Sequence, residues 1–216
     1  MAFDKISGIL KTSLGETLIM VFCSTILACI IGAAMAVILI VTEKKGTRPN
    51  RYIYGLVNGV INILRSFPFV ILMVAIIPFT KIIVGKSIGT IAAIVPLTIA
   101  AAPFVARIIE GALNEVDKGI IEAAKSLGAT NTTIIFKIML KEALPSIVSG
   151  ITLTIINIIG YSAMAGSIGG GGLGAAAITY GYNRYNTAFM IYTVIVLVIL
   201  VQLIQWAGNK IYKKLL

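Results

Sequence analysis

Long apolar runs separated by short polar segments dominate the chain. A helix needs about 20 apolar residues to cross the hydrocarbon core of a bilayer, and five runs are long enough. They are residues 17–42, 57–80, 88–109, 147–166 and 187–209. Arg65 and Pro68 interrupt the second, and Pro96 and Pro103 should bend the third. Residues 49–64 carry few charges, so this stretch is predicted either to lie on the membrane surface or to begin the second span.

The basic residues lie mostly in the short segments between the runs. One side of the five predicted spans holds Lys44, Lys45, Arg48, Arg51, Arg107, Lys118, Lys125, Lys137, Lys141, Lys210, Lys213 and Lys214, and the other holds Lys5, Lys11, Lys81, Lys86 and Arg184. The positive-inside rule places the richer side in the cytosol. The N-terminus is therefore predicted outside, with residues 110–146 and the C-terminus inside. Arg65 lies near the richer side and is expected to snorkel, and Arg107 and Glu110 are expected to form a local ion pair.

The composition is typical of a membrane protein. Hydrophobic residues make up 58% of the 216 residues and charged residues 12%, with a mean hydropathy of +1.01, whereas a soluble domain carries about twice that share of charge. We expect one all-α transmembrane domain over residues 1–216, embedded in lipid. The net charge of +10 does not indicate nucleic-acid binding, because the basic residues form no stripe that could follow phosphates. The chain has no His, and Cys23 and Cys29 point apart on one helix, so we expect no metal site.

A polar, helix-forming stretch at residues 114–144, here called the polar segment, interrupts this apolar background. Asp117 is predicted to cap a helix from Lys118 to Leu127, and Gly128 is predicted to end that helix in a left-handed conformation. A second helix is expected to be capped by Thr130, Asn131 or Thr132. Pro145 is predicted to end this second helix just before the fourth span.

Both predicted helices of the polar segment have an apolar face. These faces comprise Ile120, Ile121, Ala124 and Leu127 on the first helix, and Ile134, Ile135, Ile138 and Met139 on the second. One interpretation is a helical hairpin that packs under the chain's own membrane helices. The other is a helix offered to a groove on a partner protein, with anchors spaced i, i+4 and i+7.

The spacing of the polar segment resembles a family signature. The segment is similar to the EAA motif of bacterial ABC importer permeases. In this motif, Glu122-Ala123-Ala124 is followed after three residues by Gly128, and after nine more by Ile138-x-Leu140. The resemblance implies that the short helix docks in a cleft of a separate ATP-binding subunit and transmits its closure. The residues it assigns to coupling are Glu122, Ala123, Ala124, Leu127, Gly128, Ile138 and Leu140. The family usually has Pro directly after this motif, where this chain has Lys141, so the second helix is expected to continue to Pro145.

Other stretches resemble the methionine-import permeases of this family. They are Arg65-Ser66-Phe67-Pro68-Phe69, Ile94-Val95-Pro96-Leu97-Thr98, Ala102-Pro103-Phe104, Gly160-Tyr161-Ser162-Ala163-Met164 and Tyr180-Gly181-Tyr182. The resemblance implies a type I ABC importer in the bacterial cytoplasmic membrane, with this chain as a homodimer. It also implies two ABC ATPase subunits that carry the ATP and Mg, and an extracytoplasmic substrate-binding lipoprotein. No cofactor is expected on this chain.

A glycine-rich segment follows the fourth span. Its candidate residues are Gly169, Gly170, Gly171, Gly172 and Gly174. Three of them match G-x-G-x-x-G, but no strand precedes them, so the dinucleotide-binding interpretation fails. The chain also lacks the P-loop pattern G-x-x-x-x-G-K-[ST]. The segment is predicted to be either a flexible outer loop or close helix packing, or else part of an outer gate or a binding-protein contact.

The fourth span carries polar and soft side chains at Asn157, Tyr161, Ser162 and Met164. Asn157 and Tyr161 are one turn apart and share a face. These side chains are expected either to form hydrogen bonds inside the bundle or to line the translocation pathway or its gate across a dimer axis. A thioether such as that of Met164 is an adaptable plug and could touch an apolar substrate.

No pair of residues in the sequence predicts an enzyme site. The function most consistent with the residues is the permease subunit of an ATP-driven importer for a small molecule, with methionine favoured by the resemblance. One alternative is a permease for another amino acid or a dipeptide. The other is an ion-coupled carrier or channel acting without an ATPase, which would need charged groups in the spans or an inverted repeat.

Overall fold

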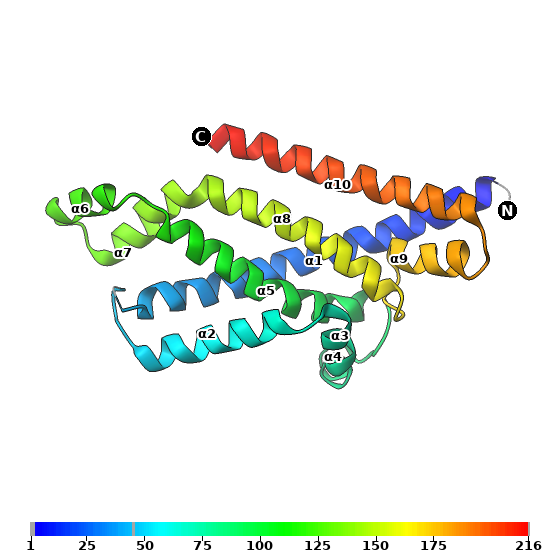
Figure 1. Cartoon of the computed structure of the whole chain (residues 1–216), viewed down its shortest axis with the longest axis horizontal. Coiled ribbons are helices and arrows are strands. Elements are labelled where there is room, and N and C mark those ends of the chain that lie inside the picture. Colours follow the sequence, from blue (N-terminus) through cyan, green and yellow to red (C-terminus); the bar gives the residue numbers. More distant parts are fainter. Residues whose placement is uncertain (1–2, 45, 216) are drawn as a thin grey trace.

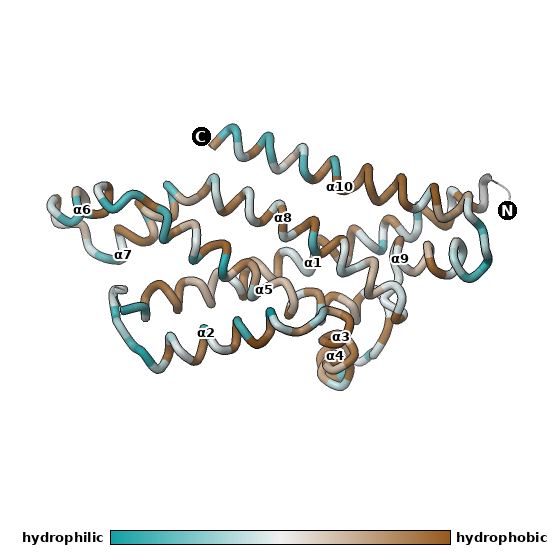
Figure 2. The backbone as a smooth tube through the Cα atoms, viewed as in Figure 1, coloured by the Kyte–Doolittle hydropathy of each residue, from teal (hydrophilic) through white to brown (hydrophobic). Residues whose placement is uncertain are grey.

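Four long helices form an elongated bundle in the computed structural model, which describes residues 3–44 and 46–215 and so leaves out Lys45 of the predicted basic side. They are α1 (Phe3–Thr42), α5 (Thr90–Asn114), α8 (Leu140–Gly166) and α10 (Thr187–Leu215). All four are long and apolar enough to cross a membrane. They run along the long axis of the molecule (Figure 1), and hydrophilic residues gather at α6 and in the connection before α10 (Figure 2). The described residues contain no strand.

The predicted second span is broken into three helices. They are α2 (Arg51–Ser66), α3 (Phe69–Ala75) and α4 (Ile77–Val84), with an angle of 107° between α2 and α3. The residue before a proline avoids the helical region, and Phe67 is accordingly extended, with φ −77° and ψ 129°. The break falls at Pro68, where an interruption of the run 57–80 is predicted, whereas Arg65 lies inside α2. The described chain has four candidate spans, or five if this bent pair counts as one.

Helix α2 is capped at its first turn and packs against the bundle at Ile61. The Asn50 side chain caps it by accepting hydrogen bonds from the backbone N–H groups of Tyr52 and Ile53, at 3.0 and 3.1 Å. Ile61 is fully buried in a cluster with Leu39 of α1 and Ala106 of α5. Helix α2 thus packs against α1 and α5 through one face, while most of its other side chains are exposed, and both alternatives for residues 49–64 stay predictions.

The core lies mainly between α1 and α5, the most extensive helix pair of the fold. Met20, Leu97, Val105 and Ile158 are fully buried in this core. The two helices approach closely because Gly32 has no side chain: a Cβ there would lie 2.6 Å from the Cβ of Val105. Helix α1 begins at Phe3, well before the predicted apolar run at residues 17–42. The run missed the first turns because they are less apolar than a membrane span requires.

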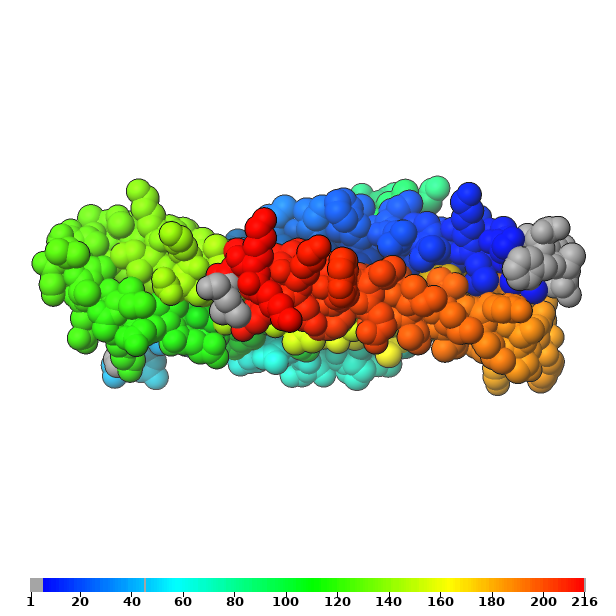
Figure 3. All heavy atoms as spheres, turned by 90° about the horizontal axis from the view of Figure 1, so that it is seen from above, coloured from blue at the N-terminus to red at the C-terminus, as the bar shows by residue number. Residues whose placement is uncertain are grey.

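Short elements lie at the two ends of the bundle. At one end, called the α6 end, lie α6 (Lys118–Ser126) and α7 (Asn131–Thr133). At the opposite end, called the α9 end, lie α9 (Gly172–Ala176) and the π-helical turn η2 (Ala177–Tyr182). In the view from above, the green residues of the α6 end and the orange residues before α10 occupy opposite extremes of the molecule (Figure 3).

One continuous helix joins the polar segment to the fourth span. Residues 131–166 form α7, a π-helical stretch η1 (Ile134–Met139) and α8 without interruption. The prediction that Pro145 ends a separate helix is therefore wrong. Proline removes only one backbone hydrogen bond and has a φ that suits a helix, and the burial of Ala143 and Ile147 on either side holds the chain helical through it.

Candidate functional site

The helix α6 has the two ends that its sequence predicts. The Asp117 side chain accepts a hydrogen bond from the backbone N–H of Gly119 at 2.5 Å, which caps the first turn. At the other end Gly128 has a φ of 77°, and the N–H of Ala129 reaches back to the carbonyl of Ala124 at 3.0 Å. This left-handed termination turns the chain sharply into α7.

The two faces of the polar segment do different things. Ala124, Ile134 and Ile135 are buried against the chain's own helices, as the packing interpretation expects. Glu122, Ala123 and Gly128 are exposed, and Leu127 is 88% exposed. Of the predicted apolar face of α6, Ala124 is buried whereas Ile120 and Leu127 are exposed, Leu127 lying at the C-cap of the helix. The segment thus packs through one face and leaves the other free for a partner.

The remaining two residues of the predicted coupling motif lie along the continuous helix. Ile138 is half-buried in η1 and Leu140 is exposed at the start of α8. A cavity of about 670 Å³ separates α6 from the ends of α1 and α5, with Glu43, Lys118 and Lys125 on its polar side. Because of this cavity, α6 is supported by its own chain on part of its surface only.

A row of exposed small, polar and soft side chains, here called the α8 stripe, follows one face of α8. Its members are Ser146, Ser149, Leu153, Asn157, Gly160 and Met164. Over residues 191–203 of α10, most of the exposed side chains are instead Ile, Val and Leu, as expected for a surface that faces lipid. Small and polar residues on a membrane helix favour contact with another helix or with water.

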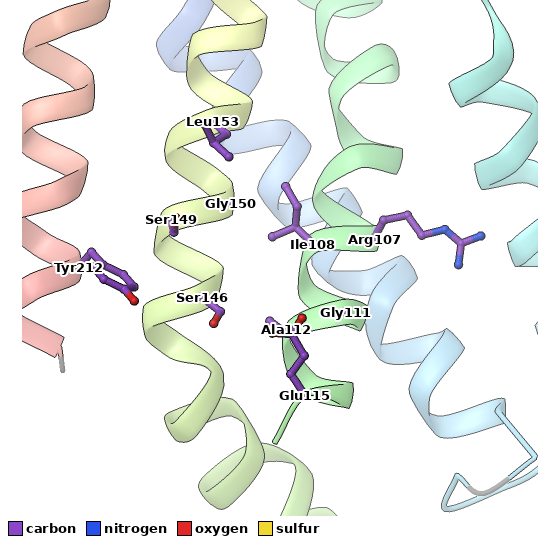
Figure 4. Close-up of a pocket in the computed structure, with 10 residues that line it drawn as sticks. All are labelled: Arg107, Ile108, Gly111, Ala112, Glu115, Ser146, Ser149, Gly150, Leu153 and Tyr212. Carbon is purple, nitrogen blue, oxygen red and sulfur yellow. The ribbon is translucent and has the colours of Figure 1, made fainter. Parts of the chain in front are cut away.

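The part of the α8 stripe nearest the α6 end borders a cavity of about 400 Å³ between α5, α8 and α10 (Figure 4). Ser146 and Ser149 line it from α8 and Glu115 from α5, while Tyr212 points toward it from α10. The cavity combines hydroxyl and carboxylate groups with a wall of small residues, which suits the passage or weak binding of a polar solute.

The predicted gate residues divide into two groups. Asn157 and Met164 are exposed on the α8 stripe, where they can face a pathway. The ring of Tyr161 is stacked on Phe69 of α3, with ring centroids 4.7 Å apart. Ser162 is buried and donates a hydrogen bond to the carbonyl of Ile159 at 2.7 Å, so the interior interpretation describes it better than the gate.

The glycine-rich segment packs tightly at the α9 end. A Cβ on Gly174 would lie 2.5 Å from the Cα of Ala163, and one on Gly170 would lie 2.8 Å from the carbonyl oxygen of Ala165. Gly171 and Gly172 have φ values of 80° and 76°. Gly169 is exposed. Close packing therefore accounts for most of these glycines.

Glu16 and Thr17 of α1 hold this segment in place. The Glu16 carboxylate accepts a hydrogen bond from the N–H of Gly172 at 2.6 Å, and the Thr17 hydroxyl accepts one from the N–H of Leu173 at 2.9 Å. These two bonds satisfy the first N–H groups of α9. The sequence reasoning missed this role, although Glu16 is an acidic residue at the edge of a long apolar run.

Arg107 joins α2 to α5. Its predicted ion pair with Glu110 is present at 2.6 Å. The same guanidinium also donates hydrogen bonds to the side-chain oxygens of Asn58 and Asn62, the latter at 2.8 Å. The two asparagines went unnoticed in the sequence, where their signal is a pair of amides one helical turn apart in a mostly apolar stretch.

The bonds of Arg107 to Glu110, Asn58 and Asn62, here called the Arg107 clamp, lead to a first prediction. We expect Arg107→Gln to destabilise the folded chain by about 1–3 kcal/mol, since it removes charge-assisted hydrogen bonds and leaves Glu110 unpaired. Thermal unfolding of the purified protein in detergent measures the effect. The control is Arg51→Gln, because Arg51 is exposed at the start of α2, the helix to which Arg107 is bonded. This variant should unfold at the same temperature as the wild type. Equal unfolding temperatures for both variants would contradict the clamp.

No metal site is visible in the described part of the chain. Among residues 3–44 and 46–215, no three His, Cys, Asp or Glu side chains come together in a way that could hold a metal ion. Cys23 and Cys29 are both free thiols.

Comparison with known sequences gives a consistent picture. The model of the family described as binding-protein-dependent transport system inner membrane component matches residues 28–214. The probable D-methionine transport system permease protein MetI of Vibrio cholerae is 50% identical over 208 residues, covering 96% of this chain and 92% of that protein. The methionine import system permease protein MetP of Bacillus subtilis is 45% identical over 174 residues, covering 81% and 78%.

Solved structures agree with the sequence relatives. An inward-facing conformation of the MetNI methionine ABC transporter has a chain that matches with a TM-score of 0.95 and 46% identity over 100% of both chains. A crystal structure of an amino acid ABC transporter with histidines matches with a TM-score of 0.82 over 99% of this chain and 97% of that one. The second match is 21% identical, so it shows a shared fold alone.

Proposed function

Since the chain belongs to the family of binding-protein-dependent transport system inner membrane components, we propose that it is the membrane-spanning permease of an ATP-driven methionine importer. The observation that carries this proposal is the match over the full length of both chains to a methionine ABC transporter at 46% identity. The methionine transport permeases that cover most of this chain at 42–50% identity support the same substrate.

The free face of the polar segment supports docking to a separate ATPase. Glu122, Ala123, Leu127 and Gly128 are exposed on a short helix, with a rigid cap at each end. A helix with fixed ends and a free face suits a groove on a partner. ATP and Mg are then held by that partner. In this chain, α6 moves with the groove when the partner binds them.

The α8 stripe supports a second copy of the chain as partner. A single chain leaves Ser146, Asn157 and Met164 exposed, and such a face cannot rest against lipid at low cost. In a homodimer these residues from the two copies would meet and enclose a pathway. The basic residues favour the topology with the α6 end in the cytosol and the α9 end outside, where a substrate-binding lipoprotein would dock.

Transport then follows from coupling between two access states. To move a protein from mostly one state to mostly the other, a ligand must bind the favoured state by about 5.5 kcal/mol more strongly. Nucleotide binding to the ATPase subunits can supply this difference if α6 is held rigidly in its groove. The role of the permease is to convert closure of the ATPases into a change of access for methionine.

The experiment that tests this function is reconstitution into liposomes. The chain, its ATPase and a substrate-binding lipoprotein should together accumulate methionine only when ATP is supplied on the ATPase side. Uptake by the chain without any ATPase would instead support an ion-coupled carrier. Uptake of another amino acid or a dipeptide in preference to methionine would refute the assigned substrate.

Met164 provides a prediction for the pathway. It is 48% exposed at the end of the α8 stripe, so Met164→Ala should leave folding and ATPase association intact. We expect it to change basal ATPase activity or methionine uptake about threefold or more, because it removes an adaptable plug. Leu203→Ala, at an exposed apolar position of α10, is the control. Wild-type values for both activities in Met164→Ala would remove Met164 from the gate.

A further inference from the structure

Arg65 carries a positive charge well inside the length of the bundle. It lies 14 residues after Arg51 on α2, which is about 21 Å along the helix, in a membrane whose core is about 30 Å thick. Its guanidinium carbon lies 5.0 Å from the ring centroid of Phe104. Phe104 precedes the end of α5 at Asn114 by ten residues, or about 15 Å. The guanidinium therefore lies over Phe104 and is not extended along α2 to the α6 end.

No described carboxylate of the chain neutralises Arg65. The acidic side chains whose placement is described lie toward the ends of the bundle, at Glu16, Glu43, Glu110, Glu115, Asp117, Glu122 and Glu142. Glu110 is on the same helix as Phe104 but is bound by Arg107. Because a second copy would carry the same residues at the same depths, a symmetric partner would not bring these carboxylates to Arg65 either.

The guanidinium is held on one side and open on the other. Arg65 is exposed, while the Phe104 ring covers one face of the guanidinium in a cation–π contact. Its N–H donors are available at the rim of that plane. An uncompensated charge at this depth is costly, so its open side requires water or an anion.

A row of polar side chains on α2 leads from the Arg107 side chain to Arg65. Asn58, Asn62 and Arg65 follow one face of α2 at i, i+4 and i+7. Arg107 binds both asparagines and also lines the cavity that contains Ser146 (Figure 4). In Figure 4 the Arg107 side chain points from α5 away from α8, consistent with its bonds to α2. Polar side chains thus follow α2 from the Arg107 guanidinium to Arg65.

We propose that Arg65 binds the carboxylate of the amino-acid substrate as the substrate passes through the membrane. This inference rests on the proposed function and names a contact point within it. A guanidinium matches a carboxylate with two parallel hydrogen bonds. Lipid phosphates lie at the headgroups, outside the hydrocarbon core, so they are not at this depth. The contact is transient, since conduction requires a site that the substrate can leave.

The test measures methionine binding to the intact permease–ATPase complex in nanodiscs, without the binding lipoprotein. We compare wild type, Arg65→Gln, Arg65→Lys and the control Arg51→Gln, which changes an exposed arginine on the same helix. Loss of a charge-assisted contact should weaken binding about tenfold or more in Arg65→Gln. Arg65→Lys should lie between, because it keeps the charge without the planar fork, and Arg51→Gln should match the wild type.

A second measurement needs no variant. Methionine amide has the same side chain and amino group as methionine but no carboxylate. The wild-type complex should bind it about tenfold more weakly than methionine or worse, and Arg65→Gln should bind the two alike. If Arg65→Gln does not assemble, this comparison on the wild type decides the matter.

The outcomes separate this inference from the proposed function. Absence of ATP-dependent methionine uptake by the complete wild-type transporter in liposomes would refute both. Normal wild-type uptake together with equal binding of methionine and its amide would refute the carboxylate site alone. The same conclusion would follow from Arg65→Gln binding methionine as the wild type does.

Discussion

Replacing Gly128 by valine should separate the permease from its ATPase while leaving the permease folded in the membrane. Gly128 has a φ of 77°, a conformation that costs an L-residue about 1–2 kcal/mol and a β-branched residue more. No atom lies within 4 Å of the position where its Cβ would be, so the substitution causes no clash. The strain falls on the turn between α6 and α7, which is the turn that presents the exposed face of α6.

The measurement is co-purification of the ATPase with a tagged permease, followed by ATP-dependent methionine uptake. Gly85→Val is a matched control, because Gly85 has a φ of 76° and an equally empty surrounding but ends α4, far from α6 in the sequence. We expect Gly128→Val to retain less than about a tenth of the wild-type ATPase, a loss of 1.4 kcal/mol or more in association. Retention by Gly128→Val equal to that by Gly85→Val would refute the docking role.

Replacing Gly166 by alanine should prevent stable folding of the chain. A Cβ at this position would overlap the backbone nitrogen of Ala175 and lie 2.7 Å from the carbonyl carbon of Gly174. These are backbone atoms of α9, which two hydrogen bonds hold to α1, so they cannot move aside cheaply. Overpacking of a tight contact costs about 1–3 kcal/mol and sometimes more, and this contact has no flexible side chain to absorb it.

Gly160→Ala is the control for this second prediction. Gly160 is on the same helix α8, and no atom lies within 4 Å of its would-be Cβ, so its alanine variant should be as stable as the wild type or more so. Yield of monodisperse protein and thermal unfolding in detergent measure both variants. A Gly166→Ala protein with wild-type stability would show that the segment is a flexible loop.

The features of the fold that depend on local sequence were predictable. The long apolar runs located α1, α5, α8 and α10, and the caps of α6 followed from Asp117. Helix continuity was not predictable, because the effect of a proline depends on its surroundings. Pro68 bends the chain by 107° between two helices, whereas Pro145 sits inside one.

The candidate site was predictable only where its residues lie close together in the sequence. The ion pair of Arg107 with Glu110 spans three residues and was found, whereas its bonds to Asn58 and Asn62 cross 49 and 45 residues and were not. The support of the glycine-rich segment by Glu16 spans 156 residues. Contacts of this kind depend on which helices become neighbours, and no local pattern specifies that.

The uninterrupted helix over residues 131–166 has a mechanical consequence. Its 36 residues extend about 54 Å, so one continuous helix runs from the turn after Gly128 to the tight contact at Gly166. A tilt of about 10° around its middle would displace each tip by roughly 5 Å, in opposite directions. In the proposed homodimer, a tilt of this continuous helix that spreads the two copies at one end would draw them together at the other. A rod of this length would make simultaneous opening to both sides of the membrane geometrically unfavourable.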